Sequence, residues 1–206
     1  MKKLLIFDYD GVIVDSLVIF RKNLIEACAR RASVDISEKD FLELFDGNMY
    51  EGMARLGVLE DKIPQILEDL KEGLSKEQGN LKLFDGIDEV ARRLSKQNYS
   101  AIITSNVSSV VENYLTSRGM NCFTEVLGAD KGTSKVQKIG ILKSRYPGFM
   151  CYYVGDTLGD MIEGKAAGVI TIAVTWGWHN EERLLKGKPD YIVNKPLELV
   201  NLFKET

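Results

Sequence analysis

The stretch Leu4-Leu5-Ile6-Phe7-Asp8-Tyr9-Asp10-Gly11-Val12 decides the fold, because it places two carboxylates and a glycine directly behind four apolar residues. Four consecutive apolar residues indicate a strand buried on both faces, and such strands belong to parallel sheets covered by helices. Ligands bind beyond the carboxyl ends of the strands in these folds. Asp8 and Asp10 are therefore expected at a reactive site, close enough to share a cation or to divide acid and base chemistry. One of them could instead cap the next helix, but Asp15 and Ser16 already offer that cap.

The composition is that of an ordinary globular protein. The chain has 206 residues, of which 45% are hydrophobic and 28% charged, enough for one core or for a core with a small inserted module. A net charge of -3 provides no basic field, so neither nucleic acid nor a membrane is an expected partner. Cys28, Cys122 and Cys151 are scattered and are expected to be reduced. Nothing after Met1 resembles a signal peptide and no run approaches the ~20 apolar residues of a membrane span, so the cytoplasm is the expected location.

Residues 15–82 are expected to form an all-helical module inserted after the first strand. Apolar residues at helical spacing over 17–28 predict a first long helix. Ser37 with Asp40 predicts the start of a second helix, and Pro64 suits the first turn of a later one. The segment contains no convincing strand.

Residues 1–14 and 83–206 are expected to form an α/β core, with a parallel sheet covered by helices on both faces. From Leu83 onward, strand patterns alternate with helix patterns, which favours crossover connections between parallel strands. The predicted strands after the first are 100–103, 124–127, 151–154 and 169–174, with an edge strand at 191–193.

Polar side chains follow three of these buried strands. They are Asp8 and Asp10, Thr104, and Asp156 with Asp160. Right-handed crossovers place such strand ends on one edge of the sheet. Four carboxylates at one edge repel one another unless a cation offsets them. Carboxylate oxygens suit Mg²⁺, which usually completes its coordination with waters and a substrate phosphate oxygen, whereas no histidine or cysteine cluster offers a zinc or copper site.

Magnesium beside a carboxylate favours phosphoryl transfer, in which one Asp attacks phosphorus to form an aspartyl-phosphate and a second Asp protonates the leaving oxygen. Thr104 and Lys135 could hold the phosphoryl oxygens. Each is weak evidence alone, because a strand-end Thr is usually structural and a helix Lys usually faces water. Lys135 follows the helix cap expected at Ser134, however, where the helix dipole disfavours a cation. The single histidine, His179, lies in a predicted loop and is not expected to take a direct part.

With these residues in place, the chain resembles the haloacid dehalogenase superfamily, in its phosphoglycolate-phosphatase-like branch, nearly from end to end. The resemblance implies a Rossmann-like core with a small inserted helical cap. Asp8-Tyr9-Asp10-Gly11-Val12 is similar to the family's first motif. It implies that Asp8 is the nucleophile, that Asp10 is the general acid and base, and that the Asp10 backbone carbonyl joins Asp8 on the metal.

The second and fourth motifs of the family also have counterparts. Thr104 closes the strand that resembles the second motif and would bind the phosphoryl group. The run from Gly155 to Asp160 resembles the fourth motif, which implies Asp156 as a metal ligand and Asp160 as a ligand or an anchor. The residues expected to contact the substrate are Asp8, Gly11, Thr104, Ser105, Asn106 and Lys135.

The third motif departs from the family's commonest pattern. Many relatives carry Lys-Pro here, whereas this chain has Lys131-Gly132-Thr133-Ser134-Lys135-Val136. Ser-Lys at a helix start is similar to a variant seen in the family, so Lys135 is the expected phosphate-binding lysine. Lys131 is the alternative.

The resemblance implies a magnesium-dependent phosphatase that hydrolyses a small phosphorylated metabolite, phosphoglycolate-like or a sugar phosphate, beneath a cap that excludes water. Asp10 argues against a dehalogenase, because displacing a halide needs no proton donor. A sugar-phosphate mutase of the beta-phosphoglucomutase type remains the alternative, and a non-catalytic phosphometabolite-binding relative is a third reading that the complete motifs disfavour. Specificity is expected to lie near the Asp46-Gly47 turn, with Arg21 or Lys22 as further candidates. The sequence leaves the oligomeric state open.

Overall fold

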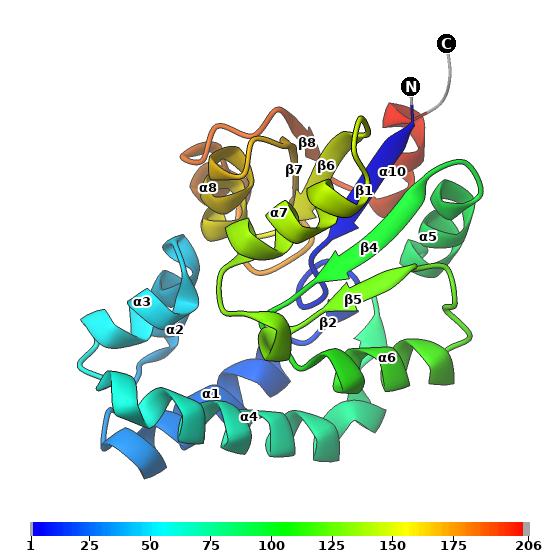
Figure 1. Ribbon diagram of the computed structural model, residues 1–206. Coiled ribbons are helices and arrows are strands. Elements are labelled where there is room, and N and C mark those ends of the chain that lie inside the picture. Colours follow the sequence, from blue (N-terminus) through cyan, green and yellow to red (C-terminus); the bar gives the residue numbers. More distant parts are fainter. Residues whose placement is uncertain (1, 204–206) are drawn as a thin grey trace.

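A computed structural model describes residues 2–203 of the chain. Its core is one sheet of six strands, which are β1 (Lys3–Phe7), β4 (Tyr99–Ile103), β5 (Glu125–Leu127), β6 (Met150–Gly155), β7 (Ile170–Val174) and β8 (Tyr191–Val193). In space they follow the order β5-β4-β1-β6-β7-β8 (Figure 1), and every neighbouring pair is parallel. The predicted parallel sheet is confirmed.

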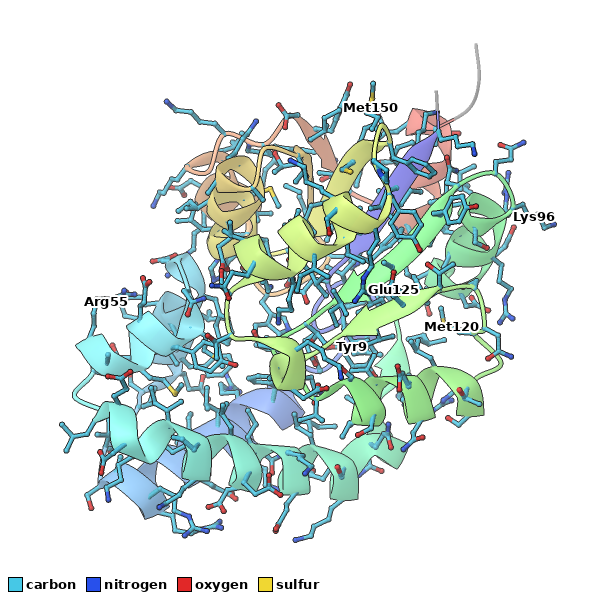
Figure 2. All side chains as sticks on the ribbon, in the orientation of Figure 1. Tyr9, Arg55, Lys96, Met120, Glu125 and Met150 are labelled. Atoms are coloured by element: carbon cyan, nitrogen blue, oxygen red, sulfur yellow. The ribbon has the colours of Figure 1, made fainter. Side chains whose placement is uncertain are left out.

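Strand β1 lies at the centre of the sheet, between β4 and β6. Its last residue, Phe7, is level with Ile102 of β4 and Val154 of β6. The residues that follow these three strands therefore leave the sheet at the same edge, as the crossover rule requires. Figure 2 shows Met150 at the opposite end of the sheet from Tyr9.

Helices cover both faces of the sheet. Leu5 and Phe7 of β1 face a cluster built with α5 (Ile87–Ser95), α6 (Ser108–Ser117) and α10 (Pro196–Leu202). Leu4 and Ile6 face the other side, where α7 (Lys135–Arg145) packs, and α8 (Leu158–Ala166) and α9 (Glu181–Leu185) cover the neighbouring strand β7. All four apolar residues are fully buried, which explains why this strand has no polar alternation.

The helical insert begins and ends at a short two-stranded ribbon. Strands β2 (Val14–Asp15) and β3 (Lys82–Leu83) pair antiparallel, so the chain leaves and rejoins the core at one place. Between them lie α1 (Leu17–Ala32), α2 (Glu38–Glu43), η1 (Leu44–Asp46), α3 (Met49–Arg55), η2 (Glu60–Lys62), α4 (Ile63–Glu77) and η3 (Gln78–Asn80). Helices α1 and α4 pack side by side (Figure 1). The segment is helical as expected, while its division from the core as a cap domain of residues 15–82 remains a proposal.

The predicted helix starts hold with one exception. Ser37 and Asp40 form a capping box, and the Ser134 hydroxyl accepts a hydrogen bond from the Gln137 N–H at the start of α7. The cap expected from Asp15 and Ser16 is wrong, because Ser16 occupies the N-cap position without a side-chain hydrogen bond to the helix. Its backbone (φ -112°, ψ -1°) is not in the extended region that N-cap side chains need to reach the N2 or N3 amide.

The three cysteines lie apart and are all free thiols, with Cys28 and Cys151 buried and Cys122 partly buried. They form no disulfide within residues 2–203. Over the same range, no helix is both long and apolar enough to cross a membrane.

Candidate active site

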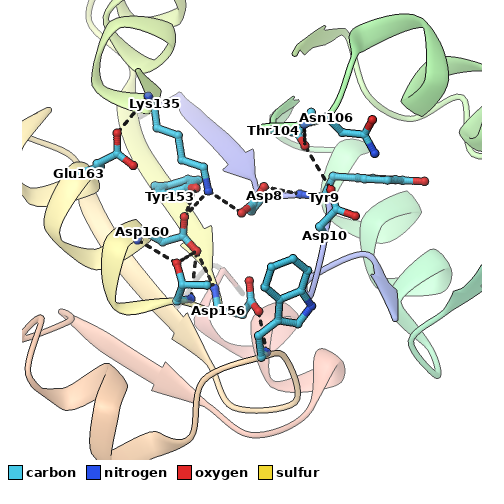
Figure 3. Close-up of polar contacts among 12 residues, drawn as sticks. Asp8, Tyr9, Asp10, Thr104, Asn106, Lys135, Tyr153, Asp156, Asp160 and Glu163 are labelled. Carbon is cyan, nitrogen blue, oxygen red and sulfur yellow. Dashed lines mark hydrogen bonds and ion pairs between the residues drawn. The ribbon is translucent and has the colours of Figure 1, made fainter. Parts of the chain in front are cut away.

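Asp8 is the first residue after β1, and its carboxylate is held from two sides. Its Oδ1 accepts a hydrogen bond from the Tyr9 N–H at 2.7 Å, and its Oδ2 accepts one from Lys135 Nζ at 2.6 Å (Figure 3). Burial raises the pKa of Asp8 to about 7, although the Lys135 cation opposes that rise. A buried carboxylate paired with one cation retains part of its nucleophilic character while its position is fixed.

Lys135 reaches this site from the first turn of α7. Its Nζ also donates to Asp160 Oδ1, so it bridges two carboxylates. Burial alone would lower the pKa of Lys135, but Asp160 and Asp8 outweigh it and hold that pKa well above its usual value. The alternative lysine, Lys131, is 56% exposed and lies 3.5 Å from Asp130 instead. The structure therefore brings Lys135 to Asp8 and leaves Lys131 outside.

Asp10 lies in the turn beyond Asp8 and beside Thr104. Its Oδ2 accepts a hydrogen bond from Thr104 Oγ1 at 3.4 Å, and its buried Oδ1 has no partner within residues 2–203 (Figure 3). Burial raises the pKa of Asp10 to about 6. A carboxyl group that exchanges its proton near neutrality is suited to act first as an acid and then as a base.

Gly11 allows this turn to close against the neighbouring strand end. Its φ is +80°, and a Cβ at this position would collide with the Asp156 carboxylate. The glycine therefore brings the Asp8–Asp10 turn directly against Asp156, which any larger residue would prevent.

Asp156 and Asp160 follow β6 but have different surroundings. Asp156 Oδ2 accepts the Trp178 N–H at 2.7 Å, while its buried Oδ1 has no partner among the residues described. Both oxygens of Asp160 are engaged: Oδ2 accepts the N–H groups of Asp156 and Thr157 and the Thr157 hydroxyl, and Oδ1 accepts the Tyr153 hydroxyl and Lys135. Asp160 therefore anchors the loop and Lys135.

Three of the carboxylates lie close enough together to hold a hard divalent cation. Oxygens of Asp8, Asp156 and Asp160 lie within 4.8 Å of one another, and all three residues are buried. Burial and then the charges of Asp160 and Asp8 raise the pKa of Asp156 well above its usual value. A cation would favour the ionised forms. The unpartnered Asp156 Oδ1 and the oxygen-only donor set fit Mg²⁺.

The loop after β4 uses its polar groups in different ways. Thr104 Oγ1 accepts the Asn106 N–H at 2.9 Å, and the Asn106 side-chain Oδ1 accepts the Val107 N–H at 2.8 Å. Ser105 lines the cavity above Asp8. Of the predicted substrate contacts in this loop, Asn106 thus has its side-chain oxygen committed to holding the loop.

The sequence analysis missed Lys138, which lies behind Thr104. This side chain is 1% exposed, and its Nζ donates to the Thr104 carbonyl at 2.6 Å. Burial, and then the charge of Lys135, lower the pKa of Lys138 to about 8. The available signal was its place three residues after Lys135, because residues at that spacing lie on the same helix face.

A cavity of about 20 Å³ lies over the carboxylates. Its polar lining consists of Asp8, Asp10, Ser105, Lys135 and Thr157, and its apolar lining consists of Phe20, Phe45 and Trp178. This volume holds about one water molecule, so the insert is closed over the site. The aromatic residues were also missed, because apolar residues at helical spacing indicate core packing.

Of the predicted specificity residues, the Asp46-Gly47 turn directly follows Phe45 of the cavity lining, whereas Arg21 and Lys22 lie elsewhere. Arg21 pairs with Glu38 at 3.1 Å and Lys22 with Glu77 at 3.1 Å, and neither residue lines the cavity.

Polar contacts of Leu42, Asp46 and Asn48 join the insert to the core around the cavity. Asp46 Oδ2 accepts Arg183 Nη2 at 2.7 Å within a two-point ion pair. Asn48 Nδ2 lies 3.3 Å from Glu163 Oε1, which also accepts the Lys135 N–H. His179 Nδ1 accepts the Leu158 N–H, and its Nε2 lies 3.0 Å from the Leu42 carbonyl. His179 thus links the core to the insert through hydrogen bonds and does not line the cavity. The sequence analysis likewise expected no direct chemical part for it.

Known proteins resemble this chain over almost its whole length. Over residues 5–174 it matches the family model of the haloacid dehalogenase-like hydrolases. It is 28% identical to a phosphoglycolate phosphatase of Synechococcus elongatus, covering 95% of this chain and 94% of that one, and 22% identical to the pyrophosphatase PpaX of Bacillus mycoides, covering 95% and 94%. A haloacid dehalogenase-like family hydrolase from Streptococcus pneumoniae has the same fold, with a TM-score of 0.79, 22% identity and coverage of 98% and 99%. The chain therefore belongs to the haloacid dehalogenase-like hydrolases.

Proposed function

We propose that this protein is a magnesium-dependent phosphatase that hydrolyses a small phosphorylated metabolite through a covalent aspartyl-phosphate. The observation that carries the proposal is the Asp8 carboxylate, held 2.6 Å from Lys135 beside the proton-exchanging carboxyl of Asp10. Two relatives at low identity are named as a phosphoglycolate phosphatase and a pyrophosphatase, which supports a phosphate ester or anhydride as the substrate. The cytoplasmic location expected from the sequence stays a prediction.

The reaction would proceed in two displacements on Asp8. A carboxylate oxygen of Asp8 attacks phosphorus, the bond from phosphorus to the leaving oxygen breaks, and Asp10 gives its proton to that oxygen. Asp10 then takes a proton from a water molecule that attacks the aspartyl-phosphate, which releases phosphate and restores Asp8. Lys135 and Thr104 would hold the phosphoryl oxygens as their charge shifts in each transition state.

We assign the metal to Asp8, Asp156 and the backbone carbonyl of Asp10. Bound Mg²⁺ would neutralise phosphoryl charge and the repulsion between these carboxylates. Asp160 acts in this assignment as an anchor, because hydrogen bonds already engage both of its oxygens. The helices of residues 15–82 would act as a lid, since the closed cavity has no room for a substrate until they move.

Replacing the nucleophile tests the proposal. Asp8→Asn keeps the size and the fold but removes the attacking carboxylate, so phosphate release should fall by about 10⁴-fold or more. The measurement is phosphate release from a panel of phosphorylated metabolites with Mg²⁺, beside a thermal melt of each variant. Asp15→Asn, which makes the same change at an exposed position, is the matched control and should leave activity unchanged. Substantial turnover by Asp8→Asn, or by the wild type after complete metal removal, would refute the mechanism.

A sugar-phosphate mutase would use the same core residues. Phosphate release without recovery of an isomeric sugar phosphate separates the phosphatase from the mutase. Turnover of any compound in the panel excludes the non-catalytic reading.

A further inference from the structure

We propose that the leaving group of the substrate is uncharged and presents an apolar face, so that phosphoglycolate is a poor substrate of this protein. This inference rests on the proposed phosphatase function and specifies its substrate class. It follows from the apolar part of the cavity lining.

Three aromatic side chains form this apolar lining, which we call the aromatic wall: Phe20 of α1, Phe45 of η1 and Trp178 of the loop after β7. The Trp178 ring lies 4.8 Å from that of Phe45, at 84°, and 5.2 Å from that of Phe20, at 61°. Each residue is at least nine-tenths buried. Edge-to-face packing of this kind fixes the rings and presents carbon surface to a ligand.

Cationic side chains are absent from this wall. Of the described residues that line the cavity, Lys135 alone is cationic, and it is already bound to Asp8 and Asp160. Every lysine and arginine of the described insert, residues 15–82, is at least partly exposed. Arg183, the basic residue at the border of insert and core, is held by both oxygens of Asp46.

A carboxylate on the leaving group would therefore be buried against the aromatic wall without a free cationic partner, since the wall offers it only the neutral Trp178 Nε1–H, which has no partner within residues 2–203. Transferring an ion from water to such a place is strongly unfavourable. The nearby Asp10 carboxyl would repel it further once it has given up its proton to the leaving oxygen. An uncharged leaving group avoids both the cost of burying an ion and the repulsion by Asp10. If it carries an alkyl chain or a ring, it also gains contact with the aromatic wall.

A matched pair of substrates tests this inference in the wild-type protein with Mg²⁺. Phosphoglycolate carries a carboxylate where 2-hydroxyethyl phosphate carries a hydroxymethyl group. In both compounds the leaving oxygen is that of a primary alcohol. We expect kcat/KM to be at least about tenfold higher for 2-hydroxyethyl phosphate. Benzyl phosphate should be hydrolysed at least as well, and inorganic pyrophosphate, whose leaving group is an anion, should be poor.

Two arginine variants locate the effect. Phe45→Arg places a cation in the wall and should shift the ratio of the two kcat/KM values at least tenfold toward phosphoglycolate. Leu56→Arg adds the same charge at an exposed position of the insert and should leave the ratio unchanged. If the wild type prefers phosphoglycolate, or hydrolyses both equally, this inference is wrong and the proposed function stands. If no compound releases phosphate, both this inference and the proposed phosphatase function are wrong.

Discussion

Asp8 and Asp10 stand two residues apart, and their surroundings give them different capacities. The Asp8 carboxylate accepts from Lys135 and the Tyr9 N–H, whereas Asp10 accepts only the longer bond from Thr104 and keeps one oxygen unpartnered within residues 2–203. A cation bound to Asp8 would lower the pKa of Asp8 below its metal-free value of about 7. The Asp10 carboxylate lies outside the cluster of Asp8, Asp156 and Asp160, so its pKa of about 6 would change less. A bound cation would therefore favour ionised Asp8 for attack, while Asp10 could still exchange a proton near pH 6.

Lys138 is a positioning residue for Thr104 and gives a residue-scale prediction. Lys138→Met removes the Nζ donor from the Thr104 carbonyl, so kcat should fall by about tenfold to a hundredfold through misplacement of the threonine. Lys131→Met, at an exposed position, is the control and should leave kcat unchanged. Steady-state kinetics of both variants makes the comparison, and an unaltered kcat in Lys138→Met would remove Lys138 from the site.

The stability difference between the wild type and Lys138→Met should depend on pH. A loss of packing alone would give a difference that does not change with pH. Folding lowers the pKa of Lys138 from 10.5 to about 8, so between these pH values the unfolded chain binds more protons than the folded protein. The unfolding free energy of the wild type relative to Lys138→Met should therefore rise with pH across that window, by roughly 1.4 kcal/mol per pH unit at most. Urea unfolding at pH 7.5 and pH 10 measures the difference. A flat difference would contradict the buried, shifted amine.

Sequence reasoning reached the strand-end residues but not those that support them. Asp8, Thr104 and Asp156 follow apolar runs, and parallel topology alone brings such positions together. Lys138 offers only its spacing from Lys135, and the aromatic wall offers no signal, because an aromatic residue has the same local pattern whether it faces a site or a core. Only the tertiary packing distinguishes these cases.

Among the elements, the predicted strands and helices are confirmed because buried apolar runs, helical spacing and capping residues act locally. The start of α1 at Leu17 agrees with its predicted range, but Ser16 at the N-cap makes no side-chain hydrogen bond to the helix. Sequence patterns also do not show which elements touch across the insert and the core. The pairing of η1 with α9 through Asp46 and Arg183 is a contact between residues 137 positions apart.

This ion pair between η1 and α9 should control the opening of the insert. Both side chains are partly exposed, so the coupling energy in a double-mutant cycle of Asp46→Asn and Arg183→Met should be about 1 kcal/mol or less in unfolding free energy. Loss of the Asp46–Arg183 ion pair should nevertheless change kcat and KM together, because closing of the insert over the core would complete the site. Lys39→Met, which breaks an exposed pair within α2, is the control. Kinetics of Arg183→Met that match those of the control would show that the pair does not govern closure.

At the scale of the whole molecule, two apolar clusters meet at the active site. One belongs to the sheet and the other to the insert, and Trp178 of the core packs into the second with Phe20, Phe41 and Phe45. The catalytic carboxylates lie between the two clusters, where their burial raises the pKa of Asp8 and Asp156. The fold therefore places repelling acids in a buried interior, so a metal bound there would directly affect global stability.

Asp156→Asn tests that effect without any turnover. Because burial and the acids Asp160 and Asp8 raise its pKa, the folded metal-free protein retains a proton on Asp156 that the unfolded chain has released, and its stability falls as pH rises toward neutrality. An amide resembles the protonated form, so at pH 7.5 the variant should be more stable than the wild type in a chelator. Added Mg²⁺ at 100 times its dissociation constant should stabilise the wild type by about 2.7 kcal/mol and the variant by much less. Calorimetric melts with and without Mg²⁺, with Asp15→Asn as the control, measure both shifts. Equal stabilisation of wild type and Asp156→Asn by Mg²⁺ would place the metal elsewhere.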